Sequence, residues 1–391
     1  MRDTLAWQWV AALACLLLAV PMPGFAGAAE NISQQTNEEL TKAGSKAGDA
    51  LGQKPEVDGK PSFVFLPIPR SDPTMGTGVT LVGAVLYNPN DSPRPWVTGV
   101  GALATSNGSR ALGAGQQASF LEDKVRLLAG FGKADLNLKF YGIGEASASR
   151  QIFVPISEDG SFVLAQGLYG LTKEFFVGLR YIDLRVTTTI DPSTLNSQFG
   201  LNLQPVELDH RTSMLGPAIE YDSRDNQFEP SHGIYATMQL MYATPKLGGD
   251  VSYRSLRSQY AQYWSVSPDV VFAGQVSFCA LDGNVPFTEL CLYGTGNDLR
   301  GYTGGQYRDR SMYTVQGETR WQFAERWGAV LFAGIGSVAN RVSDLLSVTQ
   351  LPSAGVGLRW LASKQYKVNL SLDVAVGRDG SAVYLYIGEA F

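Results

Sequence analysis

Segments of about ten residues that alternate apolar and polar side chains fill most of this sequence, and they constrain its fold more than any other feature. The clearest runs from Tyr366 to Val376, where apolar residues hold nearly every even position and mostly polar residues lie between them. Ile234–Tyr242 and Tyr313–Phe323 repeat the pattern. A period of two with one apolar face is typical of β-strands. The chain is therefore predicted to be all-β.

The same alternation occurs in soluble β-sandwiches, so two further features decide between architectures. Charged residues recur on the polar faces, as in Glu220, Asp222 and Arg224, which suits a wet lumen better than a dry core. Aromatic residues also gather at one set of predicted strand ends: Phe175, Phe176, Tyr221, Tyr263, Trp264, Trp321, Phe323, Trp327, Trp360, Tyr366 and Phe391. Aromatic girdles mark a membrane interface. We therefore expect a transmembrane β-barrel.

Sixteen antiparallel strands are predicted, an even number as in bacterial single-chain barrels. They cover residues 76–88, 95–106, 109–120, 124–134, 135–143, 161–172, 174–189, 212–224, 232–243, 250–265, 269–281, 311–324, 328–340, 352–361, 366–376 and 381–391. Short turns such as Asn107-Gly108 and 361–365 are assigned to one end, and the longer connections 144–160, 190–211, 282–310 and 341–351 to the other. The last strand is expected to point Glu389 and the terminal Phe391 outward.

The N-terminus indicates export. Residues 1–28 have the pattern of a signal peptide, with a basic start, a short apolar run and small residues before the cleavage point. Residues 29–61 are polar and predicted to form a flexible periplasmic tail, and 62–391 the barrel. No other segment has the eighteen apolar residues of a transmembrane helix. These features predict a protein of the bacterial outer membrane.

Net charge, cysteines and histidines indicate which ligands and reactions to expect of this chain. A net charge of -5 gives no reason to expect nucleic-acid binding. Cys279 and Cys291 remain after cleavage of the signal peptide, and in an oxidising compartment they are predicted to form a disulfide, with two buried free thiols as the alternative. His210 and His232 lie apart from any nucleophile pattern. We therefore predict no enzyme activity, no metal site and no cofactor.

Four motifs resemble the bacterial surface antigen barrel family, the membrane domain of barrel-assembly insertases, two-partner secretion pores and patatin-linked proteins. The motifs are Leu299-Arg300-Gly301-Tyr302 with Tyr307-Arg308-Asp309-Arg310; Gln316 to Trp321; Asp222, Arg224, Asp225, Pro230 and Gly233 in a turn; and Leu372–Ala375 with Ile387–Phe391. The resemblance extends over about Phe63 to Phe391. Each motif is weak alone, but their order and spacing are specific.

The resemblance implies a site. The sixth outer loop, about residues 282–311, would fold into the lumen, where Arg300 would contact Glu318 on the inner wall. Tyr302 and Tyr307 would pack against that wall, and Phe391 would end a C-terminal outer-membrane signal. The family usually has an aspartate in the strand after Glu318, where this chain has Gly334. Either Glu318 acts alone or another carboxylate replaces the missing one.

The resemblance also implies a function in protein or lipid handling at the outer membrane, through a weak seam near residues 76–88 and 381–391. The chain shows no room for the polypeptide-transport-associated (POTRA) domains that precede such barrels. The alternative is a plugged structural barrel or a passive pore without a client. Expected partners are outer-membrane lipids and a protein client or the barrel-assembly machinery, with a second copy in a homodimer as a further candidate.

Overall fold

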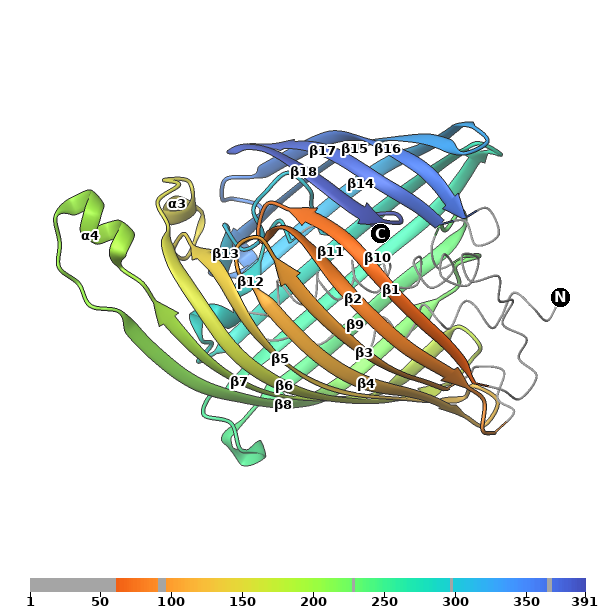
Figure 1. The fold of residues 1–391 in the computed structure, drawn as a ribbon, viewed down its shortest axis with the longest axis horizontal. Coiled ribbons are helices and arrows are strands. Elements are labelled where there is room, and N and C mark those ends of the chain that lie inside the picture. Colours follow the sequence, from red (N-terminus) through yellow and green to blue (C-terminus); the bar gives the residue numbers. More distant parts are fainter. Residues whose placement is uncertain (1–60, 91–95, 227–228, 296–297, 364–367) are drawn as a thin grey trace.

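Sixteen antiparallel strands close one barrel in the computed structural model of this protein, which describes residues 61–90, 96–226, 229–295, 298–363 and 368–391 (Figure 1). The predicted all-β transmembrane architecture and the strand number are thus confirmed. The predicted signal peptide, and the predicted tail as far as residue 60, lie outside the described residues.

The barrel strands are β1 (Ser62–Asp72), β2 (Gly76–Tyr87), β3 (Trp96–Thr105), β4 (Arg110–Phe120), β5 (Val125–Phe140), β6 (Val154–Gly170), β7 (Phe175–Ile190), β8 (Val206–Asp222), β9 (Gly233–Ala243), β10 (Tyr253–Ser267), β11 (Val270–Gly283), β14 (Ser311–Ala324), β15 (Trp327–Ala339), β16 (Leu351–Ser363), β17 (Val368–Gly377) and β18 (Gly380–Ile387). The connections contain α3 (Glu145–Ala148), α4 (Ser193–Phe199), η1 (Pro245–Leu247), η2 (Phe287–Glu289), η3 (Val342–Asp344), and β12 (Cys291–Leu292) paired with β13 (Arg308–Asp309). We call the end of the barrel with α3, α4 and the β11–β14 connection the loop end, and the opposite end the turn end (Figure 1).

The first strand was missed by the sequence analysis, which began the barrel domain at residue 62 but its first strand at residue 76. β1 pairs with β2 over eleven residues, from Ser62 to Asp72. Pro67 and Pro69 argue against a strand here, because proline cannot donate to a sheet ladder and is confined to edges, strand starts and bulges. The total remained sixteen because residues 124–134 and 135–143, predicted as two strands, form the single strand β5.

The apolar face of β5 changes sides halfway along the strand. Leu127 and Phe131 are exposed on the outer surface, whereas Leu136 and Leu138, further toward the loop end, are buried inside. Outward positions there carry charge instead, as in Lys133, whose ammonium lies 3.1 Å from Asp159 on β6. One half of β5 faces lipid with its apolar side, and the other half covers an internal core, so the alternation reverses between them. This reversal explains why the sequence analysis divided β5 into two strands.

Counting β1 reverses the assignment of one turn. The β3–β4 connection at Asn107-Gly108 lies at the loop end, not beside residues 361–365, because β3 runs toward the loop end and β16 runs away from it. Asn107 Nδ2 donates to the carbonyl of Asn137 at 2.8 Å, near the loop end of β5. The seam also moves, since the strand that closes the barrel against β18 is β1 rather than the strand at residues 76–88.

The C-terminus turns inward rather than continuing the wall. β18 ends at Ile387, and Gly388 adopts a φ of 103°, which favours glycine. Glu389 and Phe391 are buried, at 2% and 3% exposure. The expectation that both point outward is therefore wrong, and the carboxylate of Glu389 has arginine partners inside the barrel.

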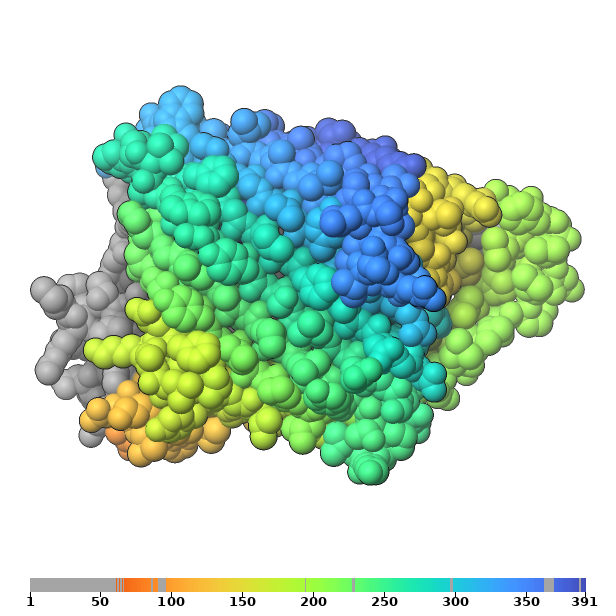
Figure 2. Space-filling model, turned by 180° about the vertical axis from the view of Figure 1, so that it is seen from behind, coloured from red at the N-terminus to blue at the C-terminus, as the bar shows by residue number. Residues whose placement is uncertain are grey.

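The predicted aromatic girdle is present in part. Trp264, Trp321, Phe323, Trp327 and Trp360 are exposed on the outer surface near the turn end. Phe176, Tyr263 and Phe391, which were assigned to the same rim, are buried inside. The space-filling view from behind shows a closed wall at this side, with the β7–β8 hairpin, in light green, extending past the loop end (Figure 2).

The interior toward the loop end is largely apolar. A large cluster of buried apolar side chains occupies the interior toward the loop end and includes Leu136, Leu184, Tyr293, Leu299 and Tyr307. Some of these come from barrel strands and others from the β11–β14 connection, so the connection is packed inside the barrel. The expectation of a wet lumen is therefore wrong for this part of the interior.

Candidate functional site

The β11–β14 connection, residues 284–310, forms the sixth loop and folds into the barrel. Its first part is attached to the wall by a disulfide between Cys279, near the end of β11, and Cys291 in β12, with Cα atoms 5.9 Å apart. β12 then pairs with β13 further along the loop. Both ends of the loop are thereby fixed, and its middle carries Leu299, Arg300 and Gly301 into the lumen.

Arg300 is almost fully enclosed, at 1% exposure. Its Nη2 lies 2.6 Å from Glu318 Oε2, and its Nη1 lies 2.5 Å from Asp373 Oδ2. Nε donates to Gln316 Oε1 at 3.2 Å, and the guanidinium lies 3.5 Å above the ring of Phe332. Charge-assisted bonds to two carboxylates and a stacked ring fix the position and the orientation of a planar guanidinium.

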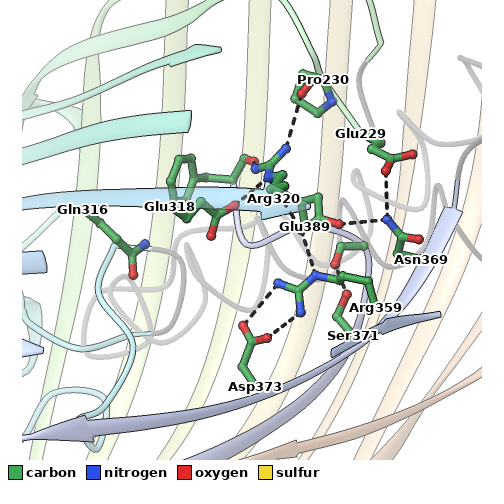
Figure 3. Close-up of polar contacts among 12 residues, drawn as sticks. Glu229, Pro230, Gln316, Glu318, Arg320, Arg359, Asn369, Ser371, Asp373 and Glu389 are labelled. Carbon is green, nitrogen blue, oxygen red and sulfur yellow. Dashed lines mark hydrogen bonds and ion pairs between the residues drawn. The ribbon is translucent and has the colours of Figure 1, made fainter. Parts of the chain in front are cut away.

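The Arg300 pairs belong to a larger ionic network on the inner wall, and Figure 3 shows the part of it around Arg320 and Arg359. It consists of Arg300, Arg320 and Arg359 with Glu318, Asp373 and Glu389. Arg320 Nε donates to Glu318 Oε1 at 2.7 Å, and Arg359 Nη1 donates to Asp373 Oδ1 at 2.5 Å. Three positive and three negative groups alternate, so each buried charge faces an opposite one, as a low-dielectric interior requires.

Asp373 replaces the carboxylate that the family pattern places at Gly334. It comes from β17, and sequence reasoning quoted it only as part of a C-terminal motif. A Cβ on Gly334 would lie 2.3 Å from Leu299 Cδ1 and 2.7 Å from the carbonyl of Val315. The space at this position is taken by Leu299, which is fully buried. Alternation along β17 could have suggested Asp373, because it points inward between the outward-facing Leu372 and Val374.

The loop motif also contacts the strands around the seam. Gly301 has a φ of 107°, and its N–H donates to Tyr384 of β18 at 2.9 Å. Tyr302 is buried, and its hydroxyl donates to the carbonyl of Pro352 at 2.6 Å. Tyr307 is buried as well and donates to Asp379, in the turn between β17 and β18. Both tyrosines thus lie against the barrel wall.

The remaining motif residues make contacts within the loop and with the end of β11, from which the loop starts. Arg308 is buried, and its Nε donates to the carbonyl of Gly305 at 3.0 Å. Burial lowers the pKa of the Arg308 guanidinium to about 10. Asp309 accepts from the N–H of Arg310 at 2.8 Å, and Arg310 Nη1 donates to the carbonyl of Gly283 at 2.8 Å. None of these described contacts reaches the ionic network.

The turn motif between β8 and β9 joins the network from the turn end. Asp222 binds Arg224 through two bonds of 2.9 Å, and Asp225 accepts from the N–H groups of residues 231 and 232 at 2.9 and 3.0 Å. Burial disfavours the charge on Asp225, but the hydrogen bonds, led by that from Ser231, outweigh it and lower its pKa. Gly233, at φ 102°, allows the close turn, and the carbonyl of Pro230 accepts from Arg320 at 3.4 Å.

The C-terminal segment is part of the same assembly. Arg320 Nη2 donates to the main-chain oxygen of Phe391 at 2.6 Å, and Arg359 Nε donates to Glu389 Oε2 at 2.8 Å. Asn369 Nδ2 reaches the other oxygen of Glu389 at 2.8 Å. Beside them, at the turn end, is a cavity of about 240 Å³ lined by these arginines and by Trp321 and Trp327.

A second wall contact of the loop was not foreseen from the sequence. Glu289, at 1% exposure, accepts from Thr212 Oγ1 at 2.5 Å, from the hydroxyl of Tyr253, and contacts His210 Nε2 at 3.0 Å. His210 lies in β8, not in an outer loop. The residues meet because β8 and β10 face the first part of the loop, which no local sequence signal shows.

The described residues contain no cluster of three His, Cys, Asp or Glu side chains that could hold a metal ion. They also contain no helix long and apolar enough to cross a membrane. The contacts of the described residues form an assembly of ion pairs and hydrogen bonds that joins a loop, the barrel wall and the C-terminal segment.

Comparison with known proteins gives a family and a fold. Residues 117–388 match the Omp85 superfamily domain. The structure resembles BamA from Haemophilus ducreyi lacking POTRA domains 1-3, with a TM-score of 0.59 and 13% identity over 84% of this chain and 70% of that one. It also resembles CdiB from Acinetobacter baumannii (TM-score 0.55, 10% identity) and CdiB from Escherichia coli (0.54, 13%). Each match covers 84% of this chain, which spans 59% and 62% of the CdiB chains.

Among curated proteins no sequence matches. The identities to the solved structures are low, so these structures support the barrel fold and not a particular activity.

Proposed function

We propose, since the chain belongs to the Omp85 superfamily, that it inserts or moves polypeptide at the outer membrane through the seam between β1 and β18. Membership confirms the resemblance stated from the motifs. The outward-facing apolar residues would contact outer-membrane lipids, and a protein client or the barrel-assembly machinery would be the partner.

The observation that carries the proposal is the weakness of this seam. β1 and β18 share one residue pair, Ser71 with Leu385. Every other pair of neighbouring barrel strands shares at least seven. A net contribution of about 1 kcal/mol per backbone hydrogen bond makes this the least costly place to open the wall. An open edge is a template for pairing with another strand.

The sixth loop lies across both sides of this seam. The N–H of Gly304 donates to Thr74 Oγ1 at 2.8 Å, in the connection between β1 and β2. The N–H of Gly301 donates to the Tyr384 hydroxyl of β18 on the other side. In this proposal the ionic network sets the position of the loop, and the loop limits how far the two strands separate.

A plugged structural barrel is the second candidate. The apolar cluster that includes Leu299 and Tyr307 supports it, because the loop fills the loop-end half of the interior as a core element would. A passive open pore is the least favoured of the candidates for the same reason.

Locking the seam tests the proposal. Ser71→Cys with Leu385→Cys would place two thiols at the one pair that joins β1 to β18. The matched control is Val374→Cys with Val383→Cys, a pair inside the β17–β18 ladder whose side chains also face outward. Both proteins would be placed in liposomes with an unfolded β-barrel client, and protease-protected client would be measured with and without reductant.

The proposal expects oxidation to abolish client insertion only in the seam-locked protein, and reductant to restore it. Equal insertion with the seam locked would show that the seam is not the route. No insertion above empty liposomes, by any of the proteins, would favour the plugged structural barrel.

A further inference from the structure

We infer that the edge of β8 beyond the barrel, residues 206–210, is a strand-addition site for an extended polypeptide segment that alternates apolar and basic residues. This edge lies in the β7–β8 hairpin at the loop end, away from the seam between β1 and β18, so the inference goes beyond the proposed function (Figure 1). The segment would approach from the loop-end side of the membrane and add one strand to the hairpin.

The edge is free because β8 extends further toward the loop end than β9 does. β8 pairs with β7 as far as residue 206, whereas its pairing with β9 starts only at Met214. The β9–β10 connection covers the next part, where the N–H of Asp250 donates to the carbonyl of Arg211 at 2.7 Å. In the part of the chain that the structure describes, no main-chain group pairs with residues 206–210 on this side.

The main-chain groups of Glu207 and Asp209 point to the free side. In an antiparallel strand the N–H and C=O of one residue point to the same neighbour, and alternate residues point to opposite neighbours. Arg211 shows which side this is, because its carbonyl accepts from Asp250 and its N–H donates to Asp250 Oδ2 at 2.8 Å. Glu207 and Asp209 have the same parity as Arg211, so both present a donor and an acceptor to an added strand.

Side chains alternate between apolar and acidic along this edge. Val206 and Leu208 are 49% and 41% exposed, and they lie on the inner face of β8, which is buried further toward the turn end. Glu207 and Asp209 are exposed on the opposite face. Directly opposite residues of paired strands place their side chains on the same face. Apolar residues of an added strand would therefore meet Val206 and Leu208, and basic residues would meet the two carboxylates.

The hairpin exposes further apolar side chains just before this edge. Phe199, Leu201 and Leu203 are 55%, 48% and 47% exposed. The side chain of Asn196 exchanges two hydrogen bonds of 2.8 Å with the main chain of Leu203, which fixes this part of the hairpin. Exposed apolar side chains gathered on a surface rimmed by polar residues are typical of interaction sites.

The charges of the hairpin favour a basic partner over a second copy of this chain. No lysine or arginine occurs from residue 186 to residue 210, whereas Asp191, Glu207 and Asp209 do. Two copies of the edge paired about a two-fold axis would bring four carboxylates together, and like charges on paired strands are destabilising. Acidic residues that only protect the edge from pairing are the alternative explanation.

Peptide binding to the full-length protein tests the inference. The probe is a labelled peptide of about nine residues that alternates valine and lysine, and its binding to the protein in zwitterionic detergent would be measured by fluorescence anisotropy. Two matched probes carry backbone N-methyl groups, one on every lysine and the other on every valine. A peptide that alternates valine and glutamate is the charge control.

The position of the N-methyl groups separates strand pairing from other contacts. Lysines opposite Glu207 and Asp209 would point their N–H groups to β8, because a hydrogen-bonded pair exchanges both bonds. N-methylation of the lysines removes these donors and retains the charge, and we expect it to weaken binding on the order of tenfold. N-methylation of the valines affects groups that point away from β8 and should change binding little.

Variants of the protein locate the site. Glu207→Pro removes one N–H on the free side and leaves the bonds to β7, which come from the even-numbered residues. Glu207→Lys reverses a charge beside the added strand, and its matched control is Asp282→Lys, at an exposed acid on the outer face of β11. Both Glu207 variants should weaken binding of the valine–lysine probe several-fold, and Asp282→Lys should not.

Four results would overturn the inference. Equal binding of the two N-methylated probes would show that the contact is not strand pairing. Equal weakening by Glu207→Lys and Asp282→Lys would show attraction to the net charge alone. No binding of the valine–lysine probe above the valine–glutamate control would show that the acidic residues only protect the edge. Oligomers of the wild type that form without peptide and are abolished by Glu207→Pro would assign the edge to a second copy.

Discussion

Arg300 lies between two carboxylates, and this changes what removing either of them should do. Sequence reasoning placed Arg300 with Glu318 because of the family position and the inward face of β14. It could not choose the second acid, because Asp373 is 73 residues away and reaches Arg300 only through closure of the barrel. The glycine at residue 334 showed that an acid was missing, but not where its replacement lies.

Arg300→Ala is expected to release the loop more than either acid variant does. A buried charge left without its partner typically costs about 3–5 kcal/mol. Glu318→Gln leaves Arg300 with Asp373, and Asp373→Asn leaves it with Glu318, so each should have the smaller effect. Stability in detergent and protease cleavage within residues 298–310 would be measured.

Arg254→Ala is the matched control for this comparison. Its partner is Asp282, both side chains are about two-thirds exposed, and such an exposed pair contributes little to stability. If Arg300→Ala and Arg254→Ala give the same stability and the same cleavage as the wild type, the buried network does not anchor the loop.

Gly334→Asp tests the family pattern directly. The family pattern taken alone predicts that restoring the acid tightens the loop. The structure argues for the opposite, because the new Cβ would meet Leu299 and the carbonyl of Val315 below 3 Å. Faster cleavage of the loop than in wild type is expected, and slower cleavage would show that the wall yields and the family geometry applies.

Asp298 should make loop docking depend on pH. Burial raises its pKa to about 6 from an ordinary value of 3.8, against hydrogen bonds led by that from Thr295. The folded protein therefore binds this proton more tightly than the unfolded chain does. The contribution of Asp298 to the free energy of unfolding is complete below pH 3.8 and is lost as the pH rises through about 6. The free energy of unfolding should therefore fall by roughly 3 kcal/mol over this range.

Asp298→Asn cannot lose a proton and serves as the comparison. The difference in thermal stability between Asp298→Asn and wild type should be small at pH 4 and should grow in favour of the variant up to pH 7. A difference that stays constant over this range would contradict the burial of an ionisable group at residue 298.

At the scale of elements, alternation located the strands wherever one face stays apolar along the whole length. It failed at β1, where prolines interrupt the pattern, and at β5, where the apolar face changes from lipid to the internal core. The disulfide partners could be named because only two cysteines remained. The contact of Glu289 with β8 and β10 could not, since it depends on how the loop packs after the barrel closes.

The disulfide and the Glu289 contact should stabilise the first half of the loop independently of Arg300. Cys279→Ser with Cys291→Ser opens a ring of twelve residues and is expected to cost about 3 kcal/mol in the chain-entropy account. The cost should add to that of Arg300→Ala, because the two sites share no described contact. A combined effect equal to the larger single one would mean that the loop docks as one indivisible unit.

At the scale of the whole molecule, the two halves of the barrel interior differ in what fills them. The turn-end half holds the ionic network and the inward C-terminal segment, whereas the loop-end half holds the apolar cluster formed with the sixth loop. A barrel of sixteen strands is wide enough to leave an aqueous channel when it is empty. We therefore expect the loop to determine whether this barrel conducts.

Conductance in planar bilayers measures this directly. The intact protein is expected to conduct weakly, because the buried loop fills the loop-end half. Deleting residues 285–309 removes the loop and should raise conductance on the order of tenfold, toward that of an open channel of this strand number.

The control is deletion of residues 193–203, which lie in the β7–β8 hairpin beyond the loop end and do not belong to the internal cluster (Figure 2). That deletion should leave conductance unchanged. High conductance in the intact protein, not increased by removing the loop, would show that the apolar cluster does not close the lumen and would favour the passive pore.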